Sequence, residues 1–188
     1  VIQNDARHYW SKIANITGEP YVLPMFDYRA INHISFSTRD RSFIYRLYTG
    51  TLYGNADKAE IFKMDISPRC TWCGDDRQKW LHLMFECPAV RVVREQAAIF
   101  FDLPPMATIQ WLLASMDDPE KDKALKIVST TLAKHTHWCL NHSNQPPSIE
   151  GVKEWLRNTM DTEFVIAELN NKVLKHLQKW EYLREKLF

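Results

Sequence analysis

Three cysteines and one histidine gather between residues 70 and 87, in the pattern C-x2-C-x8-H-x4-C. They are Cys70, Cys73, His82 and Cys87. Thiolate and imidazole are ligands that Zn²⁺ prefers, and zinc binds four of them in a tetrahedron. Gly74, directly after the C-x2-C pair, has the backbone freedom that such a turn needs. A catalytic zinc keeps one position open for water, so four strong protein ligands predict one structural zinc without a catalytic water.

These cysteines have two other possible roles besides zinc binding. A redox-active C-x-x-C pair of the thioredoxin type follows a strand in a βαβ unit, and no such unit precedes Cys70. The cysteines could instead pack in a core without metal, but the position of His82 between Cys73 and Cys87 would then be a coincidence. Three of the four cysteines crowd into one segment, unlike the spread of a disulfide-bonded secreted domain, which indicates an intracellular, reducing compartment.

A second group of potential ligands lies on a predicted helix further along the chain. His135 and Cys139 share a face at a spacing of four, and His142 follows Cys139 by three, whereas His137 points elsewhere. Helical spacing produces such groups by chance, so histidines around a buried Cys139 are favoured over a second metal site.

Composition limits the folds and functions that this chain can have. The 188 residues suit one domain, or one domain with an appended segment. The chain has 24 Lys and Arg against 23 Asp and Glu, which excludes a polybasic protein. Its five glycines disfavour a barrel with many tight turns, and it has no glycine-rich phosphate loop. No apolar run is long enough to span a membrane.

Apolar spacing and capping residues predict an all-α fold organised around the zinc knuckle. The predicted helices begin at Asp5 (to Ile16), Ser37 (to Gly50), Asn55 (to Met64), Pro88 (to Phe101), Thr108 (to Met116), Asp118 (to about Leu140), Ser148, and Asp161 or Thr162 (through Leu187). Residues 19–36 read as an extended connector. The predicted division is 1–36 as N-terminal helix and connector, 37–103 as zinc-knuckle helical module, and 104–188 as C-terminal helical segment.

Three stretches of the sequence resemble the C-terminal zinc module of non-LTR (LINE-type) retrotransposon reverse transcriptases. They are residues 46–52 (RLYTGTL), residues 66–74 (ISPRCTWCG), and residues 82–88 (HLMFECP) followed by Arg94. The resemblance covers roughly residues 40–100. It departs at Gln78, Lys79 and Trp80, where the family usually has Glu-Thr a few residues before the histidine.

The resemblance implies a non-catalytic piece of a polyprotein whose polymerase domain lies upstream and would be a partner of this segment. The family module is usually assigned to binding element RNA or target DNA, which implies the nucleus and a cytoplasmic ribonucleoprotein as locations. The parent chain would be an RNA-directed DNA polymerase with endonuclease. This segment has no Tyr-x-Asp-Asp polymerase motif and no convincing endonuclease signature. Neither a small-molecule substrate nor a membrane is expected as partner.

Basic residues around the knuckle are the expected contacts to nucleic acid. They are Arg39, Arg41, Arg46, Arg69, Lys79, Arg91 and Arg94. Arg91 and Arg94, three apart, are expected to share a face. Trp72, between two ligands, is expected to point outward as a base-stacking platform. The other interpretation is that the arginines are a solvated face and that Trp72 packs on the metal cluster.

Two further functional hypotheses remain. A zinc-stabilised protein-interaction module is the second, and a zinc hydrolase or dithiol oxidoreductase is the third. The amphipathic segment from Phe164 to Phe188 is interpreted as a packed terminal helix in preference to one that binds a partner or lies on a membrane.

Overall fold

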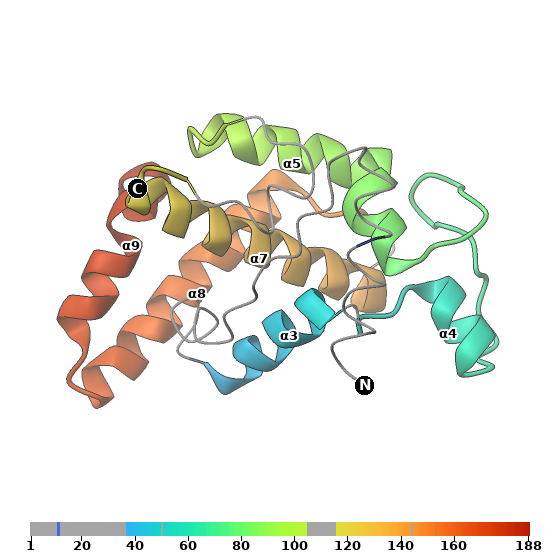
Figure 1. The fold of residues 1–188 in the computed structure, drawn as a ribbon, viewed down its shortest axis with the longest axis horizontal. Coiled ribbons are helices and arrows are strands. Elements are labelled where there is room, and N and C mark those ends of the chain that lie inside the picture. Colours follow the sequence, from blue (N-terminus) through green and yellow to red (C-terminus); the bar gives the residue numbers. More distant parts are fainter. Residues whose placement is uncertain (1–10, 12–36, 50, 105–115, 144) are drawn as a thin grey trace.

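Helices are the only regular elements in the part of the chain that the structure describes (Figure 1). The computed structural model describes Ser11 and residues 37–49, 51–104, 116–143 and 145–188. Its elements are α3 (Thr38–Thr49), α4 (Asn55–Ile61), the π-helical turn η1 (His82–Glu86), α5 (Pro88–Phe100), α7 (Pro119–His142), α8 (Ile149–Leu169) and α9 (Val173–Leu187). The all-α prediction is confirmed for these residues. The predicted helices at 5–16 and 108–116 and the connector at 19–36 lie outside them, apart from Ser11 and Met116.

Capping residues read from the sequence explain where several helices begin. The Asp118 side chain accepts the backbone N–H groups of Glu120 and Lys121, so α7 begins at Pro119. The Ser148 hydroxyl accepts the N–H of Gly151 at the start of α8. Pro88 opens α5, because the first helical position needs no N–H donor.

Two predicted caps are wrong, and both errors have a local cause. Asn55 is the first residue of α4 and not its cap; Gly54 is the cap, and its N–H donates to Asp57 Oδ2 at 3.0 Å. Neither Asp161 nor Thr162 begins a helix, because α8 runs unbroken to Leu169. The Thr162 hydroxyl donates back to the Asn158 carbonyl at 2.7 Å, so it bonds within the helix and does not act as a cap.

The chain leaves α8 through a Schellman turn. Asn171 adopts a left-handed φ of 54°, which asparagine tolerates better than most residues. The N–H of Lys172 donates to the Ala167 carbonyl at 2.7 Å, and that of Asn171 donates to Glu168 at 3.1 Å. These bonds satisfy the last carbonyls of α8 and let α9 turn back against it (Figure 1).

The described residues bury two hydrophobic cores. The bundle core joins α5, α7, α8 and α9 and comprises Val93, Ala97, Ala98, Phe101, Leu103, Ala124, Leu125, Ile127, Val128, Leu132, Val152, Leu156, Met160, Trp180, Leu183 and Leu187. The knuckle core joins α3, the cysteine segment, η1 and the start of α5 and comprises Ile44, Leu47, Leu52, Cys70, Trp80, Leu83, Met84, Cys87, Val90 and Ala133. Helices α5 and α7 contribute to both cores, so they connect the knuckle to the bundle. The predicted division at residues 103–104 stays a prediction.

None of the described helices has both the length and the apolar character that crossing a bilayer requires. All four cysteines are free thiols, and Cys73 alone among them is exposed.

Candidate metal centre

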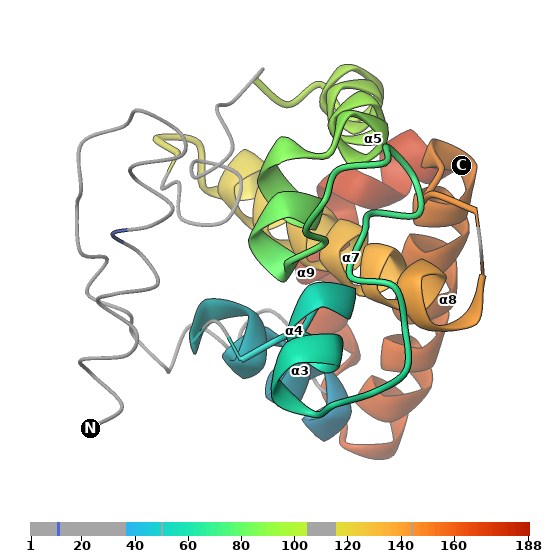
Figure 2. The same ribbon diagram turned by 90° about the vertical axis from the view of Figure 1, so that its right-hand side faces the viewer.

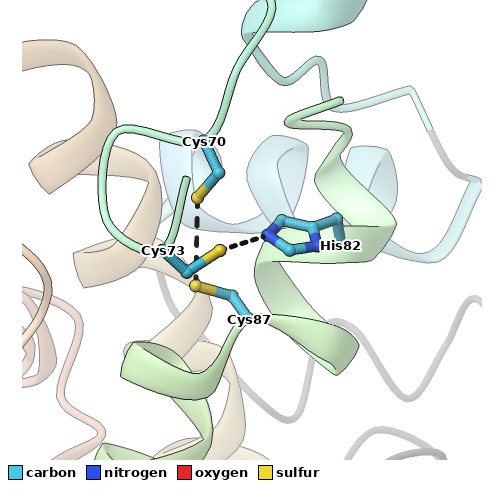
Figure 3. A group of neighbouring side chains, drawn as sticks. All are labelled: Cys70, Cys73, His82 and Cys87. Carbon is cyan, nitrogen blue, oxygen red and sulfur yellow. Dashed lines mark hydrogen bonds between the residues drawn. The ribbon is translucent and has the colours of Figure 1, made fainter. Parts of the chain in front are cut away.

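A tight turn brings the first two cysteines together. The Gly74 N–H donates to the Cys70 carbonyl at 2.9 Å, and the Cys70 N–H donates to the Asp75 carbonyl at 2.7 Å. Gly74 has a φ of +80°, in the region that side chains disfavour, so the sequence needs glycine here. The turn directs the side chains of Cys70 and Cys73 toward those of His82 and Cys87 (Figure 3).

The π-helical turn explains how a spacing of five residues can serve one site. In an α-helix, residues five apart point about 140° away from each other. In η1 the Cys87 N–H instead donates to the carbonyl of His82, five residues back, at 2.8 Å. The wider turn brings both side chains to the same side, and such turns often occur at functional sites.

The four ligand atoms lie close enough together to share one metal ion. They all lie within 4.8 Å of one another. Cys70 Sγ is 3.9 Å from Cys87 Sγ, and Cys73 Sγ is 3.3 Å from His82 Nε2. Zinc–sulfur bonds of about 2.3 Å in a tetrahedron place two sulfurs about 3.8 Å apart. The residues therefore fit a single metal ion.

The electrostatics of the cluster favour a bound cation. Burial raises the pKa of the Cys70 thiol, but the Gln78 amide and the N–H groups of Trp72 and Cys73 outweigh it and set a pKa of about 7. Burial, together with the charges of Cys70 and Cys73, raises the pKa of Cys87 to about 12. The Cys70 thiol can therefore ionise near neutral pH without a metal, whereas ionising all three thiols at that pH needs a positive ion among them.

The imidazole of His82 is oriented as a ligand. Its Nε2 faces Cys73, while its Nδ1 lies 3.5 Å from Glu86 Oε2 and 4.0 Å from Asp75 Oδ2. A carboxylate beside the distal nitrogen of a histidine keeps the proton there and leaves the other nitrogen free to bind metal. Glu86 and Asp75 are thus positioned to support the ligand, and the sequence motif does not reveal this role.

The two arginines on α5 that were predicted to bind phosphate differ in exposure. Arg91 is exposed and lies 3.9 Å from Glu95. Arg94 is only 9% exposed, and its Nη1 donates to the Met84 carbonyl at 2.9 Å. The expectation that both arginines share an exposed face is wrong, because Arg94 is turned in and binds the Met84 carbonyl. Arg94 therefore belongs to the scaffold of the site.

The other predicted basic residues fall into two groups. Near the knuckle, Arg69 is exposed and pairs with Asp76 at 3.2 Å, and Lys79 is half-buried. On α3, Arg39 and Arg46 are exposed and Arg41 is half-buried; Arg46 donates to the Thr51 carbonyl at 3.2 Å, and Arg41 donates to the Thr38 hydroxyl. Helices α3 and α5 lie on opposite sides of α7 in both views (Figures 1 and 2), so the arginines of α3 are separate from Arg91.

Trp72 does not point outward as predicted. Its ring is half-buried and packs against the knuckle core, and its Nε1 is buried without a hydrogen-bond partner. The large side chain covers part of the apolar surface beside Cys70, which matches the alternative interpretation of this residue.

The group around Cys139 does not converge as the knuckle cluster does. Cys139 Sγ lies 3.7 Å from His135 Nε2, but His137 packs edge-on against Phe43 and Trp80. His142 Nδ1 contacts the Trp138 carbonyl. Within the described residues, the cluster at residues 70–87 is the only group of three or more potential ligands close enough to share an ion.

Sequence reasoning missed Gln78 as a member of the site. Gln78 is completely buried, and its Nε2 lies 3.4 Å from Cys70 Sγ. Its position, four residues before His82, is part of the departure from the resembling family, and that departure was the only signal in the sequence.

Comparison with known protein families, with characterised proteins and with solved structures finds no match to this chain.

Proposed function

We propose that this protein is a zinc-dependent nucleic-acid-binding module of the non-LTR (LINE-type) reverse transcriptase kind. The observation that carries the proposal is the convergence of three thiols and one imidazole within 4.8 Å. Cys70, Cys73, His82 and Cys87 would hold one structural zinc. Bound zinc would offset two of the three thiolate charges and cross-link the knuckle to η1 and α5. With all four positions filled by protein, the ion would have no site for a catalytic water.

The zinc is tested by metal content. Protein purified without chelator is expected to contain one zinc per chain, and Cys87→Ser is expected to lose it. Cys139→Ser is the matched control, because Cys139 is also a buried thiol but lies outside the cluster. Absence of zinc from the unaltered protein, or equal zinc loss in both variants, would contradict the proposal.

Nucleic-acid binding is supported by the resemblance and by exposed cations beside a rigid turn. A turn held by metal and the helix α5 that follows it would present Arg69 and Arg91 with little ordering cost on binding. Arg69 pairs with Asp76, and Arg91 lies beside Glu95. Exposed ion pairs contribute little stability, so a phosphate contact could replace each of them at small cost. The ligand would be element RNA or target DNA, and the upstream polymerase domain would be an attached partner.

The binding is tested by the salt dependence of affinity for single-stranded RNA and duplex DNA. Arg91→Ala and Arg69→Ala are each expected to weaken binding and to lower the salt slope by about one unit. Arg184→Ala is the control, since Arg184 is exposed on α9. Unchanged affinity and slope in folded, zinc-loaded Arg91→Ala and Arg69→Ala proteins would remove this surface from consideration.

A protein-interaction module is the second candidate, and one observation favours it. The end of α4 and the turn after it expose three large apolar side chains: Ile61 (60% exposed), Phe62 (53%) and Met64 (50%). Adjacent exposed apolar groups often mark protein contacts. If nucleic-acid binding is absent, this turn becomes the first surface to test, with Phe62→Ser and binding to the upstream polymerase domain as the assay.

A further inference from the structure

Gln78 is an uncharged polar side chain enclosed beside the metal ligands. It is 0% exposed. Its Nε2 lies 3.4 Å from Cys70 Sγ and 3.4 Å from the Thr71 hydroxyl, whereas its Oε1 is buried without a partner. Burying an amide with one unpaired atom costs free energy, so a glutamine here needs a compensating interaction.

The direction of the amide follows from the chemistry of its neighbour. A metal-bound thiolate has no proton and can only accept hydrogen bonds. The amide nitrogen must therefore face Cys70 and the oxygen must face away. In this orientation Oε1 has no hydrogen-bond partner, so the amide gains a bond to sulfur and lacks one at its oxygen.

The backbone on both sides of Gln78 is fixed. Its N–H donates to the Pro68 carbonyl at 2.7 Å, and its carbonyl accepts the N–H of Ala56 at 3.1 Å. A Cβ on Gly54 would lie only 2.0 Å from the Gln78 carbonyl oxygen, so only glycine allows α4 to approach so closely. Backbone hydrogen bonds to Ala56, at the start of α4, and to Pro68, just before the cysteine turn, thus fix the position of Gln78 independently of a bound metal.

We infer that Gln78 is a positioning residue of the metal centre, whose side-chain N–H donates to the Cys70 thiolate and holds it in the geometry that the metal requires. The inference rests on the proposed metal site and adds a supporting residue beside its four ligands. The bond also draws negative charge away from the thiolate sulfur. A glutamate at this position is acceptor-only when ionised and could not make this bond.

Two variants distinguish the effect of the N–H donor from the effect of the side chain's volume. Gln78→Met keeps a long side chain but removes the N–H, and Gln78→Glu keeps the shape but places a carboxylate beside the thiolate. Thr71→Val is the matched control, because it removes the other neighbour of Nε2 and leaves the bond to Cys70. Co²⁺ is the probe, because its sulfur-to-metal charge-transfer band reports the thiolate directly.

Metal affinity and the cobalt spectrum are the first readouts. Gln78→Met is expected to bind Co²⁺ about 10- to 100-fold more weakly, the range found for residues that support metal ligands. Its charge-transfer band is expected at lower energy, because a thiolate without the hydrogen bond is richer in electrons. Gln78→Glu is expected to lose more affinity, and Thr71→Val to match the unaltered protein. Equal affinity and an unshifted band in Gln78→Met would overturn the inference.

A measurement on the unaltered protein covers the case in which the variants do not fold. In protein loaded with ¹¹³Cd²⁺, a hydrogen bond from Gln78 to Cys70 is expected to give scalar coupling between the side-chain amide proton and the metal. A loaded, folded protein without this coupling would overturn the role of Gln78 and leave the metal site intact. Failure to bind any metal would instead refute the proposed function, and with it this inference.

Discussion

The bundle core and the knuckle core are stabilised by different means. The bundle core is lined by aliphatic and aromatic side chains from four helices and has no titratable side chain among its members. The knuckle core draws on short elements and includes Cys70 and Cys87, with Gln78 and His82 buried beside it. Apolar burial dominates the first core, and the buried Glu163 beside it is paired by Lys179 and Trp180 within the protein itself. The second core buries groups that would become charged on binding a metal, so we expect its stability to depend on the ion.

The difference between the cores predicts the largest effect in the molecule. Removing zinc with a chelator, or with Cys87→Ser, should unfold the knuckle core while α7, α8 and α9 stay folded. The expected loss is on the order of 10 kcal/mol of local stability, the scale of zinc binding to small modules. Hydrogen exchange measures it: amides around Leu83 and Val90 should lose protection, and those around Leu156 should keep theirs.

Cys139→Ser provides the comparison, because it alters a buried thiol outside the cluster. It should leave exchange around Leu83 unchanged. Uniform loss of protection in both cores on zinc removal would mean that they form one cooperative unit, and the distinction between them would then fail.

The reverse test disrupts the bundle core. Phe101 is completely buried at the end of α5, and Phe101→Ala should cost about 3–5 kcal/mol through lost burial and a cavity. Because Phe101 lies outside the knuckle core, the folded variant should keep its zinc affinity. Denaturant unfolding gives the stability loss, and zinc titration below the unfolding midpoint gives the affinity. A tenfold fall in zinc affinity in the folded variant would show that the cores are coupled.

Much of the fold could be predicted from sequence because its signals are local. Asp118, Ser148 and Pro88 act within one turn of themselves, so the starts of three helices follow from residue type. The end of α8 could not be placed in this way. Asp161 and Thr162 have the chemistry of caps, but the helix continues through them, and the turn occurs at Asn171.

The clustering of the four side chains was predictable for a different reason than their surroundings. Cys70, Cys73, His82 and Cys87 follow a spacing that is typical of metal sites, and the structure brings them together. The inward turn of Arg94 depends on the nearby Met84 carbonyl, and the burial of Gln78 depends on the approach of α4. Both are consequences of tertiary packing, which residue spacing does not encode.

For Arg94, which lies on α5 and binds the knuckle core, we predict an intermediate effect. Arg94→Ala removes a buried, charge-assisted hydrogen bond to the Met84 carbonyl, which should cost about 1.5–3 kcal/mol. Zinc affinity should fall as well, because η1 positions both His82 and Cys87. Arg91→Ala, on the exposed face of the same helix, is the control and should change neither stability nor zinc affinity measurably. Denaturant unfolding and zinc titration of the two variants make the comparison, and equal behaviour would contradict a scaffold role for Arg94.

The smallest effect concerns the junction between the knuckle core and α7, where His137 packs between Phe43 and Trp80. Burial, together with the positive charges of Arg46 and Lys58, lowers the pKa of His137 to about 4. The unfolded chain binds this proton near pH 6.5, so it takes up more protons than the folded chain between pH 6.5 and 4. Stability from the neutral ring is therefore complete above pH 6.5 and declines as the pH falls toward 4. Because the ring is partly exposed, the expected loss between pH 7.5 and pH 5 is only about 1 kcal/mol.

His137→Phe should abolish that part of the pH dependence, because phenylalanine keeps the edge-on ring contacts and cannot take up a proton. Protonation of the zinc ligands also lowers stability at pH 5, but the two proteins share those ligands, so the difference between their pH profiles isolates His137. Urea unfolding of both proteins at pH 7.5 and pH 5 measures it. Parallel profiles would mean that His137 takes up its proton in the folded protein as readily as in the unfolded chain. The junction would then be open to water, and the knuckle core would be separated from the bundle by a hydrated surface instead of a packed one.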